Sequence, residues 1–272
     1  MKIDFLLDIG EGETNEDNLL VKDNLFGVFD GLTSLNKYKD QNGKTGGQIA
    51  SQLVKRIFEK NIDKDFKFIL HKAQESLNQG MINRNIDISS KTNRLSSSIA
   101  VVKLKNGNAE YIQVGDSPII FIFKNGSFKI VMSNKNTDKE SLLLWKKLSG
   151  RGIKSWSEDK EILNNLIKVR QMANVTFGSF NGEEEVFKFI LHDKLNLDNV
   201  TNILLLTDGL FLPQEDPNKG EVFDTLVKFY LVNGLTKLKD YVRNLEESDS
   251  KCIKYPRFKK HDDIAAISVD FK

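Results

Sequence analysis

The sequence predicts an α+β protein in which two mainly antiparallel sheets pack face to face and helix pairs cover their outer faces, a four-layer α/β/β/α sandwich. Expected strands are mostly neighbours in sequence and joined by tight turns, which is typical of antiparallel pairing. Expected helices come in pairs rather than alternating with strands, which argues against a doubly wound α/β fold. No repeat or linker divides the 272 residues, so we expect a single domain over 1–272.

The first half of the chain changes its apolar period twice. Alternating apolar residues predict strands, a helical period follows from 43 to 81, and strands return after 96. Asn106-Gly107 and Asn125-Gly126 are typical hairpin turns, so we expect an antiparallel meander from 98 to 131. The expected strands are 2–9, 18–22, 25–29, 98–104, 111–114, 119–123 and 128–131, and the expected helices are 43–60 and 64–81.

The second half begins with a segment that interrupts the strands. Thr137 and Glu140 match a capping box, which predicts a helix through Leu148. A loop over 149–157 and a helix over 158–170 follow, and we expect 135–171 to form an inserted, mobile, flap-like segment. The remaining expectations are strands at 174–180, 186–190, 201–206 and 264–269, and helices at 221–231 and 235–246 with a break at Gly234.

The composition excludes several classes of protein. With 40 Lys+Arg against 38 Asp+Glu, the net charge of +2 is not that of a nucleic-acid-coating protein, so we expect no nucleic-acid partner. The single cysteine, Cys252, excludes a disulfide framework and a cysteine-rich zinc site, which favours a reducing, cytoplasmic setting. No apolar run reaches the ~18 residues of a membrane span, and residues 1–4 show no secretory signal.

Acidic residues recur where predicted strands begin or end. Taken alone, an Asp-Gly after a strand is usually only a turn. Several carboxylates converging at one edge would repel one another without cations, and Mg²⁺ or Mn²⁺ with oxygen ligands would satisfy them. Gly31 would let a backbone carbonyl approach such an ion closely. The acidic positions are Glu16, Asp17, Asp30, Asp116, Asp208, Asp262 and Asp263.

Short motifs in these regions resemble, in the same order, those of the metal-dependent protein phosphatases (PPM, or protein phosphatase 2C-like serine/threonine phosphatases), in particular the bacterial type. The resemblance spans nearly the whole chain, and the family fold is a β-sandwich flanked by helix pairs. The matching segments are Asn-Glu-Asp at 15–17, Phe-Gly-Val-Phe-Asp-Gly at 26–31, Gly-Gly-Gln-Ile-Ala-Ser at 46–51, the Ser-rich strand at 95–102, Val-Gly-Asp-Ser at 114–117, Leu-Leu-Leu-Thr-Asp-Gly at 204–209 and His-Asp-Asp-Ile at 261–264.

The resemblance implies a role for each matching residue. Asp30 matches the carboxylate that bridges two metal ions, and the Gly31 carbonyl matches a further ligand. Asp208 and Asp262 match ligands of one of those ions, and with Asp30 they form the expected catalytic set.

Four further residues complete the expected site. Glu16 and Asp17 match an acidic pair that supports the site mostly through bound waters, with Asp17 in the metal set and Glu16 behind it. Asp116 matches an acid near a third, weaker metal position, and its alternative is an ordinary β-turn residue. His261, beside Asp262, is expected either to support the site through a hydrogen bond or to be an exposed strand-entry residue.

The implied activity is that of a metal-dependent serine/threonine phosphatase in signalling. Two Mn²⁺ or Mg²⁺ ions, with a third position, would activate a water that attacks phosphoserine or phosphothreonine in line. The implied partner is a phosphoprotein, either a protein kinase or its target.

One departure from the family keeps a second function open. Residues 11–14 lack the arginine with which many members hold phosphate. Lys37, Lys39 or Lys44 could replace it, or they could simply be solvated. A regulatory pseudophosphatase module with little or no turnover is therefore the alternative, and a hydrolase of small phosphoesters is a weaker one.

Overall fold

The structure is a computed structural model, and it describes all residues except 135–136, 150–156, 158, 221 and 272. Its described strands form two five-stranded, fully antiparallel sheets, ordered β1-β10-β9-β6-β7 and β2-β3-β4-β5-β8. The strands are β1 (Lys2–Asp8), β2 (Asn18–Lys22), β3 (Leu25–Gly31), β4 (Ser97–Lys105), β5 (Asn108–Val114), β6 (Ile119–Phe123), β7 (Phe128–Val131), β8 (Leu191–Asn196), β9 (Val200–Leu206) and β10 (Ile264–Asp270). The helices are α1 (Gly46–Lys60), α2 (Phe66–Ile82), α3 (Lys139–Ser149), α4 (Lys160–Gln171) and α5 (Phe223–Glu247).

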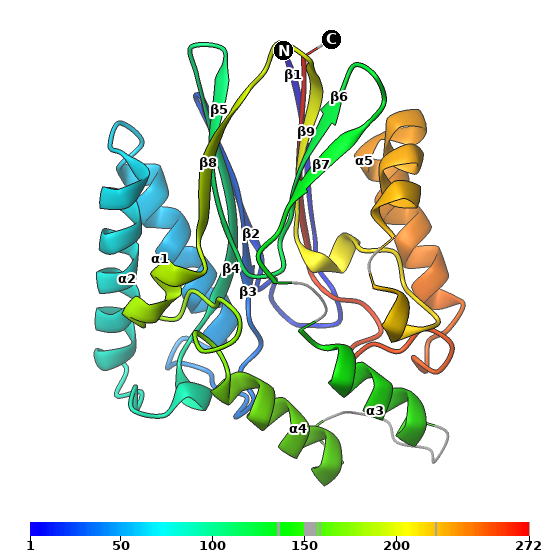
Figure 1. Ribbon diagram of the computed structural model, residues 1–272. Helices are drawn as coiled ribbons and strands as arrows, with labels where there is room; N and C mark the ends of the chain where they lie inside the picture. Colours follow the sequence, from blue (N-terminus) through cyan, green and yellow to red (C-terminus); the bar gives the residue numbers. More distant parts are fainter. Residues whose placement is uncertain (135–136, 150–156, 158, 221, 272) are drawn as a thin grey trace.

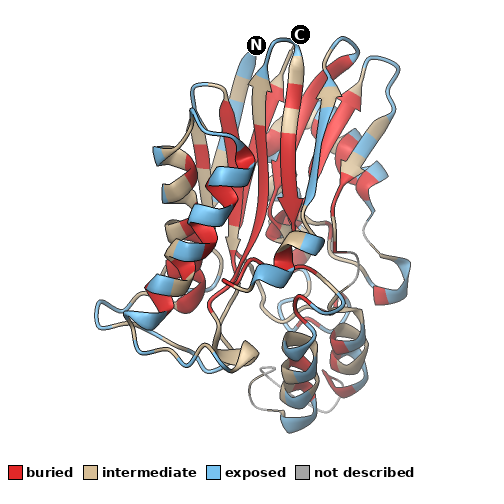
Figure 2. Ribbon diagram, turned by 60° about the vertical axis from the view of Figure 1, so that its left-hand side comes forward, coloured by how far each residue is buried: buried red, intermediate tan, exposed pale blue. Residues whose placement is uncertain are grey.

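The layers follow the expected α/β/β/α order. Helices α1 and α2 cover the outer face of the β2-containing sheet, and α5 covers the outer face of the β1-containing sheet (Figure 1). Three apolar clusters fill the three gaps, around Phe58 under α1 and α2, around Phe121 between the sheets, and around Leu238 under α5. The central strands are therefore buried on both faces while the helices expose their outer sides (Figure 2). The predicted fold class is confirmed.

The expected meander from 98 to 131 is wrong in one respect, because the chain changes sheet in its middle. Strands β4 and β5 pair in one sheet, whereas β6 and β7 pair in the other. Gly115, with a φ of +92°, makes the turn between them, and a Cβ there would lie 2.3 Å from Ser98 Oγ. Both pairs are strands joined by an Asn-Gly turn, so their sequence pattern does not reveal which sheet each strand joins.

Two expected strands, at 174–180 and 186–190, are also wrong. Residues Glu184–Lys188 form a 3-10 helix, and the true strand is β8. The apolar side chains of Val186 and Phe189 pack into the cluster under α2. Their spacing in the sequence therefore reflects this contact and not the alternation of a strand. Strand β8 lies at the edge of its sheet and is mostly exposed, so it lacks the apolar alternation of a half-buried strand.

The remaining helices agree closely with expectation. α5 bends at Gly234, which has a φ of +80°, so it consists of the two expected helical segments. Helices α3 and α4 lie at the end of the sandwich opposite the chain termini (Figure 1). The expected loop at 149–157 falls almost wholly outside the described residues. The segment between β7 and β8 therefore brings two helices to one end of both sheets.

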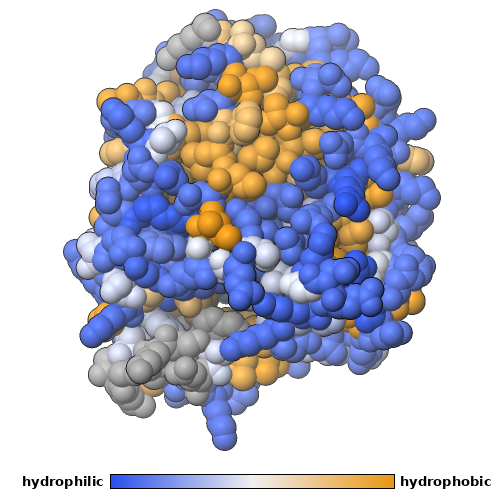
Figure 3. All heavy atoms as spheres, turned by 180° about the vertical axis from the view of Figure 1, so that it is seen from behind, coloured by the Kyte–Doolittle hydropathy of each residue, from blue (hydrophilic) through white to orange (hydrophobic). Residues whose placement is uncertain are grey.

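The back face of the molecule carries an apolar area away from this end. Figure 3 shows it in the upper part of the back face, surrounded by polar side chains. Exposed large apolar side chains include Phe5 and Leu7 of the edge strand β1 and Val232 of α5. Apolar edge strands are typical sites of contact with other chains. Among the described residues, no helix is both long and apolar enough to cross a bilayer.

Candidate metal centre

Topology brings the predicted acidic residues to one end of both sheets. Asp17 precedes β2, Asp30 ends β3 and Asp116 follows β5, all in one sheet. Asp208 follows β9 and Asp262 precedes β10, both in the other sheet. Because neighbouring strands run antiparallel, these positions lie at the same end, which is also the end of α3 and α4. All except Asp17 line one cavity of about 150 Å³.

The chain is packed tightly around Asp30-Gly31. A Cβ on Gly31 would lie 2.4 Å from both the Glu16 and the Gly47 carbonyl oxygens. Real Cβ atoms do not approach backbone oxygens so closely, so only glycine fits between these two segments. Gly31 thus allows β3 to pack against the start of α1 and places the Asp30 carboxylate at the acidic end of the two sheets.

The acidic cluster is electrostatically strained. Burial raises the pKa of Asp30 well above its usual value, and the charges of Asp17 and Asp116 raise it further. Burial also raises the pKa of Asp208 well above its usual value, as do the charges of Asp30, Asp116 and then Asp262. Mutual repulsion of this kind is relieved either by protons or by a bound cation.

The donor set suits a hard divalent cation. Asp17 is 4% exposed, and its Oδ2 is buried with no hydrogen-bond partner among the described residues. Its pKa is raised well above normal by burial, despite a hydrogen bond from Thr207. Carboxylate and carbonyl oxygens are the ligands that Mg²⁺ and Mn²⁺ prefer.

Asp262 has a cationic partner within the protein. Its Oδ1 accepts a hydrogen bond from Lys259 Nζ at 2.8 Å. In the described part of the chain, no three His, Cys, Asp or Glu side chains are arranged to enclose a metal ion. The acidic residues nevertheless fit divalent ions in kind and location.

Two cations that the sequence did not single out lie in the cavity. Burial lowers the pKa of the Lys259 ammonium, but the charge of Asp262, the hydrogen bond to it and the charges of Glu16 and Asp263 together raise the pKa above its usual value. Arg170 of α4 also lines the cavity, where burial lowers its pKa and the charges of Asp138 and Asp116 oppose that effect. Arginine remains protonated in proteins, and the raised pKa of Lys259 keeps its ammonium charged. The cluster therefore contains two positive charges.

Asp138 is a further carboxylate that sequence reasoning missed. It immediately precedes α3, lines the cavity, and has a pKa raised to about 6 by burial and by the charge of Asp116. The sequence placed Asp138 only inside a capping pattern, and it did not single out Lys259. Arg170 lay at the end of an expected helix, so nothing in the local pattern indicated that it reaches the acids.

Glu16 and Asp263 hold the site together from behind. Both are buried. The Glu16 carboxylate accepts from Thr33 Oγ1 at 2.6 Å, and its amide donates to Asp263 Oδ2 at 2.7 Å. The other Asp263 oxygen accepts from the Gly10 amide at 2.8 Å. Asp263 thus connects the segment after β1 to the start of β10 through two backbone hydrogen bonds.

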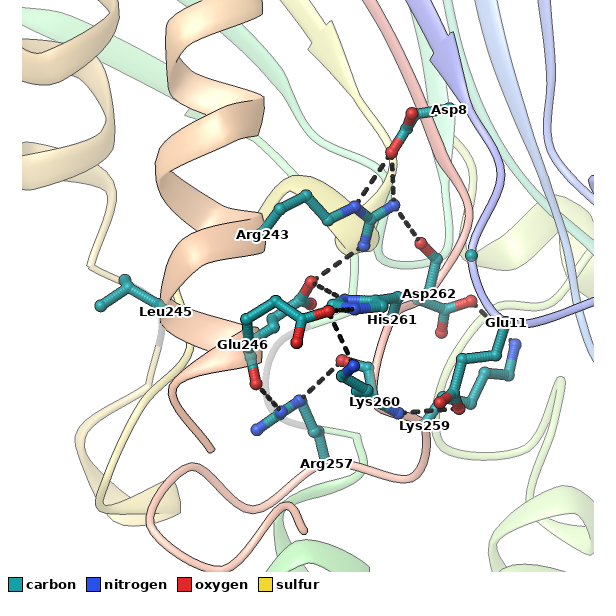
Figure 4. A network of polar contacts seen from close by, with 12 residues as sticks. Asp8, Glu11, Arg243, Leu245, Glu246, Arg257, Lys259, Lys260, His261 and Asp262 are labelled. Carbon is teal, nitrogen blue, oxygen red and sulfur yellow. Dashed lines mark hydrogen bonds and ion pairs between the residues drawn. The ribbon is translucent and has the colours of Figure 1, made fainter. Parts of the chain in front are cut away.

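His261 points toward the end of α5 (Figure 4). Its Nδ1 lies 2.7 Å from Glu246 Oε2, and its Nε2 lies 2.8 Å from Glu247 Oε1. Arg243 of α5 donates to the Asp262 carbonyl at 2.7 Å and to Asp8 Oδ2 at 2.9 Å. His261 therefore influences Asp262 through the backbone and through α5, with no described bond to a predicted ligand.

The other candidate residues have other partners. Lys39 pairs with Glu13 at 2.9 Å and Lys44 donates to Gln52 at 2.8 Å. Burial raises the pKa of the Cys252 thiol to about 11, so the thiol stays protonated near neutral pH and is no nucleophile.

Comparison with known proteins agrees with this geometry. The model of a family described as protein phosphatase 2C matches residues 8–247. Among solved structures, the serine/threonine phosphatase PstP/Ppp of Mycobacterium tuberculosis superposes with a TM-score of 0.60 at 12% identity, covering 100% of this chain and 98% of that one. Stp1 from Staphylococcus aureus gives 0.59 at 14% identity, covering 100% and 95%.

A further neighbour was solved with metal. The catalytic domain of PstP in complex with two manganese ions gives a TM-score of 0.55 at 13% identity, covering 99% of this chain and 97% of that chain. A search of curated protein sequences gave no significant match. The identities are low enough that the neighbours establish the fold alone, whereas the family model covers most of the sequence. The chain therefore belongs to the protein phosphatase 2C family of serine/threonine phosphatases.

Proposed function

We propose that this protein is an active, metal-dependent protein phosphatase that hydrolyses phosphoserine and phosphothreonine. The observation that supports this most strongly is the convergence of Asp30 and Asp116 from one sheet with Asp208 and Asp262 from the other in a single cavity. Four carboxylates in one cavity are costly to keep ionised, and this cost is offset when they hold metal ions.

In this proposal each acidic residue has a distinct task. Asp30 would hold both ions with the Gly31 carbonyl as a further ligand, Asp208 and Asp262 would hold one of the ions, and Asp17 would contribute its unpartnered oxygen. Asp116 serves a third, weaker position. Two Mn²⁺ or Mg²⁺ ions bound here would supply a hydroxide-like water and neutralise charge on the phosphoryl group.

The chain's own residues prepare the cavity for this chemistry. Thr33 and the backbone contacts of Glu16 hold the segment before β2 in place, and Asp263 anchors the segment carrying Asp262. We further propose that 135–171 acts as a flap over the cavity, because Asp138 just before α3 and Arg170 of α4 line the cavity wall. A phosphorylated kinase or its target would be the substrate, in a cytoplasmic signalling pathway.

One observation favours a second candidate, a regulatory module without turnover. The Lys259 ammonium already binds Asp262, and it would compete with a metal ion for that carboxylate. A protein in which this pair persists would keep the fold and bind phosphoproteins without hydrolysing them.

The two candidates are separated by one experiment. Hydrolysis of para-nitrophenyl phosphate and of a phosphothreonine peptide is measured with Mn²⁺ and with a chelator, alongside Mn²⁺ affinity by calorimetry. We expect Mn²⁺-dependent turnover, and we expect Asp208→Asn to weaken Mn²⁺ binding because it removes one anionic ligand. Asp193→Asn, on the exposed strand β8, is the matched control. Mn²⁺ binding without turnover would favour the module, and no Mn²⁺ binding would refute the metal site.

A further inference from the structure

The arginines around the cavity differ in how far their donors are used. Arg257, which lines a neighbouring cavity, donates to the side chain and carbonyl of Asp249 and to the carbonyls of Glu246, Tyr255 and Lys260. Arg243 donates to Asp8, Glu246 and the Asp262 carbonyl. Both guanidinium groups are thus committed to holding the protein together.

Arg170 is different. Its described hydrogen bond is a long one, 3.4 Å from Nη2 to the Thr33 carbonyl. Arg170 is half-buried, and the charges that act on its guanidinium are those of Asp138, Asp116, Asp30 and Glu16. It lines the same cavity as Asp30 and Asp208. Because no shorter hydrogen bond joins Arg170 to the described part of the chain, its guanidinium has donors available for a ligand.

Accepting the proposed function, we propose that Arg170 binds the phosphate group of the substrate and replaces the arginine missing from residues 11–14. A guanidinium presents a planar pair of N–H donors that matches two phosphate oxygens, which a lysine ammonium does not. Asp138 and Asp116 attract the guanidinium toward the cavity before substrate arrives. Arg170 would then position the phosphate beside the carboxylates of Asp30 and Asp208.

Lys259 is the competing candidate, and its contacts argue against it. Its ammonium is held 2.8 Å from Asp262 Oδ1, a predicted ligand, and the charges of Glu16 and Asp263 also attract it. An ammonium engaged in this way contributes mainly to the charge balance of the acids. Arg170 comes instead from α4, so phosphate binding would connect the 135–171 segment to both sheets.

The test compares three variants in the full chain loaded with Mn²⁺: Arg170→Met, Arg170→Lys and the control Lys168→Met. Lys168 lies on the same helix but is exposed and lines the outer groove between α3 and α4. Binding of inorganic phosphate is measured by calorimetry and hydrolysis by kcat and KM. We expect Arg170→Met to raise the phosphate Kd roughly ten- to a hundredfold, since charge-assisted hydrogen bonds are lost.

Further readouts separate binding from structure. We expect Arg170→Lys to bind phosphate more tightly than Arg170→Met, and Lys168→Met to bind it as the parent chain does. The Mn²⁺ affinity of Arg170→Met should not fall, because this substitution removes a positive charge from an acidic cluster. If the melting temperature of Arg170→Met is lowered, the phosphate Kd of Arg170→Lys is compared with that of the parent chain instead. Unchanged phosphate affinity in the folded variants, or a parent chain that binds no phosphate, would overturn the inference.

The outcomes also distinguish this inference from the proposed function. Phosphate binding that depends on Arg170 in a chain without turnover would support the role of Arg170 and refute the catalytic proposal. Normal turnover in which neither the phosphate affinity nor KM changes on substitution of Arg170 would support the catalytic proposal and refute the role of Arg170.

Discussion

Replacing Asp138 by Asn should stabilise the metal-free protein at neutral pH. The pKa of Asp138 is raised from 3.8 to about 6 by burial and by the charge of Asp116. A carboxyl whose pKa rises on folding is destabilising when ionised, so the penalty is complete above pH 6, fades as pH falls through 6, and vanishes below the unfolded value. The shift corresponds to about 3 kcal/mol at most, and partial exposure of the side chain reduces it to about 1–2 kcal/mol.

The assay is urea unfolding in the presence of a chelator at pH 7.5 and pH 5. Asp138→Asn should raise the free energy of unfolding by about 1–2 kcal/mol at pH 7.5 and by about half as much at pH 5. Glu140→Gln is the matched control, because it removes a charge from the first turn of the same helix at an exposed position. A gain no larger than that of Glu140→Gln, or a gain that grows on acidification, would refute the reasoning.

Three further substitutions test other parts of the site. Gly31→Ala should lower the free energy of unfolding by about 1–3 kcal/mol in urea titrations, because its Cβ would lie 2.4 Å from two backbone oxygens; an unchanged midpoint would contradict this. Lys259→Met should tighten Mn²⁺ binding in calorimetry by about tenfold, since Asp262 loses a competing charge-assisted bond, and weaker binding would count against that role. Arg243→Met should lower the free energy of unfolding in urea by about 3 kcal/mol because the buried Glu246 loses its arginine partner and keeps only His261, and a change under 1 kcal/mol would be inconsistent with that.

The fold could be predicted from the sequence wherever the burial of a strand or helix is reflected in the pattern of its apolar residues. Strands β3, β9 and β10 are almost fully buried, and their apolar runs identify them directly. Strand β8 was missed because an edge strand with exposed side chains needs no such run. The change of sheet at Gly115 was missed because sheet membership depends on tertiary packing rather than on local periodicity.

The candidate site divides in the same way. Asp30, Asp116, Asp208 and Asp262 lie beside strands, so a strand boundary already indicates which end of the sheet they occupy. Asp138, Arg170 and Lys259 reach the cavity from the inserted helices or from a loop, whose path over the sandwich leaves no periodic signal. The absence of an arginine from residues 11–14 could be seen in the sequence. Its proposed replacement, Arg170, lies 158 positions after residue 12 and could not be predicted, because only the fold brings α4 close to the acidic residues.

The route of the chain between the two sheets has a consequence for how the sandwich opens. Three connections cross from one sheet to the other at the acidic end, at 9–17, 115–118 and 132–190, whereas the β8-β9 connection crosses at the end that holds both termini. The acidic end is thus closed covalently, and the terminal end is held mainly by apolar packing. Thermal opening should therefore start among the hairpin tips near 106–107 and 125–126, where backbone amides would exchange with solvent long before those next to Asp30 and Asp208.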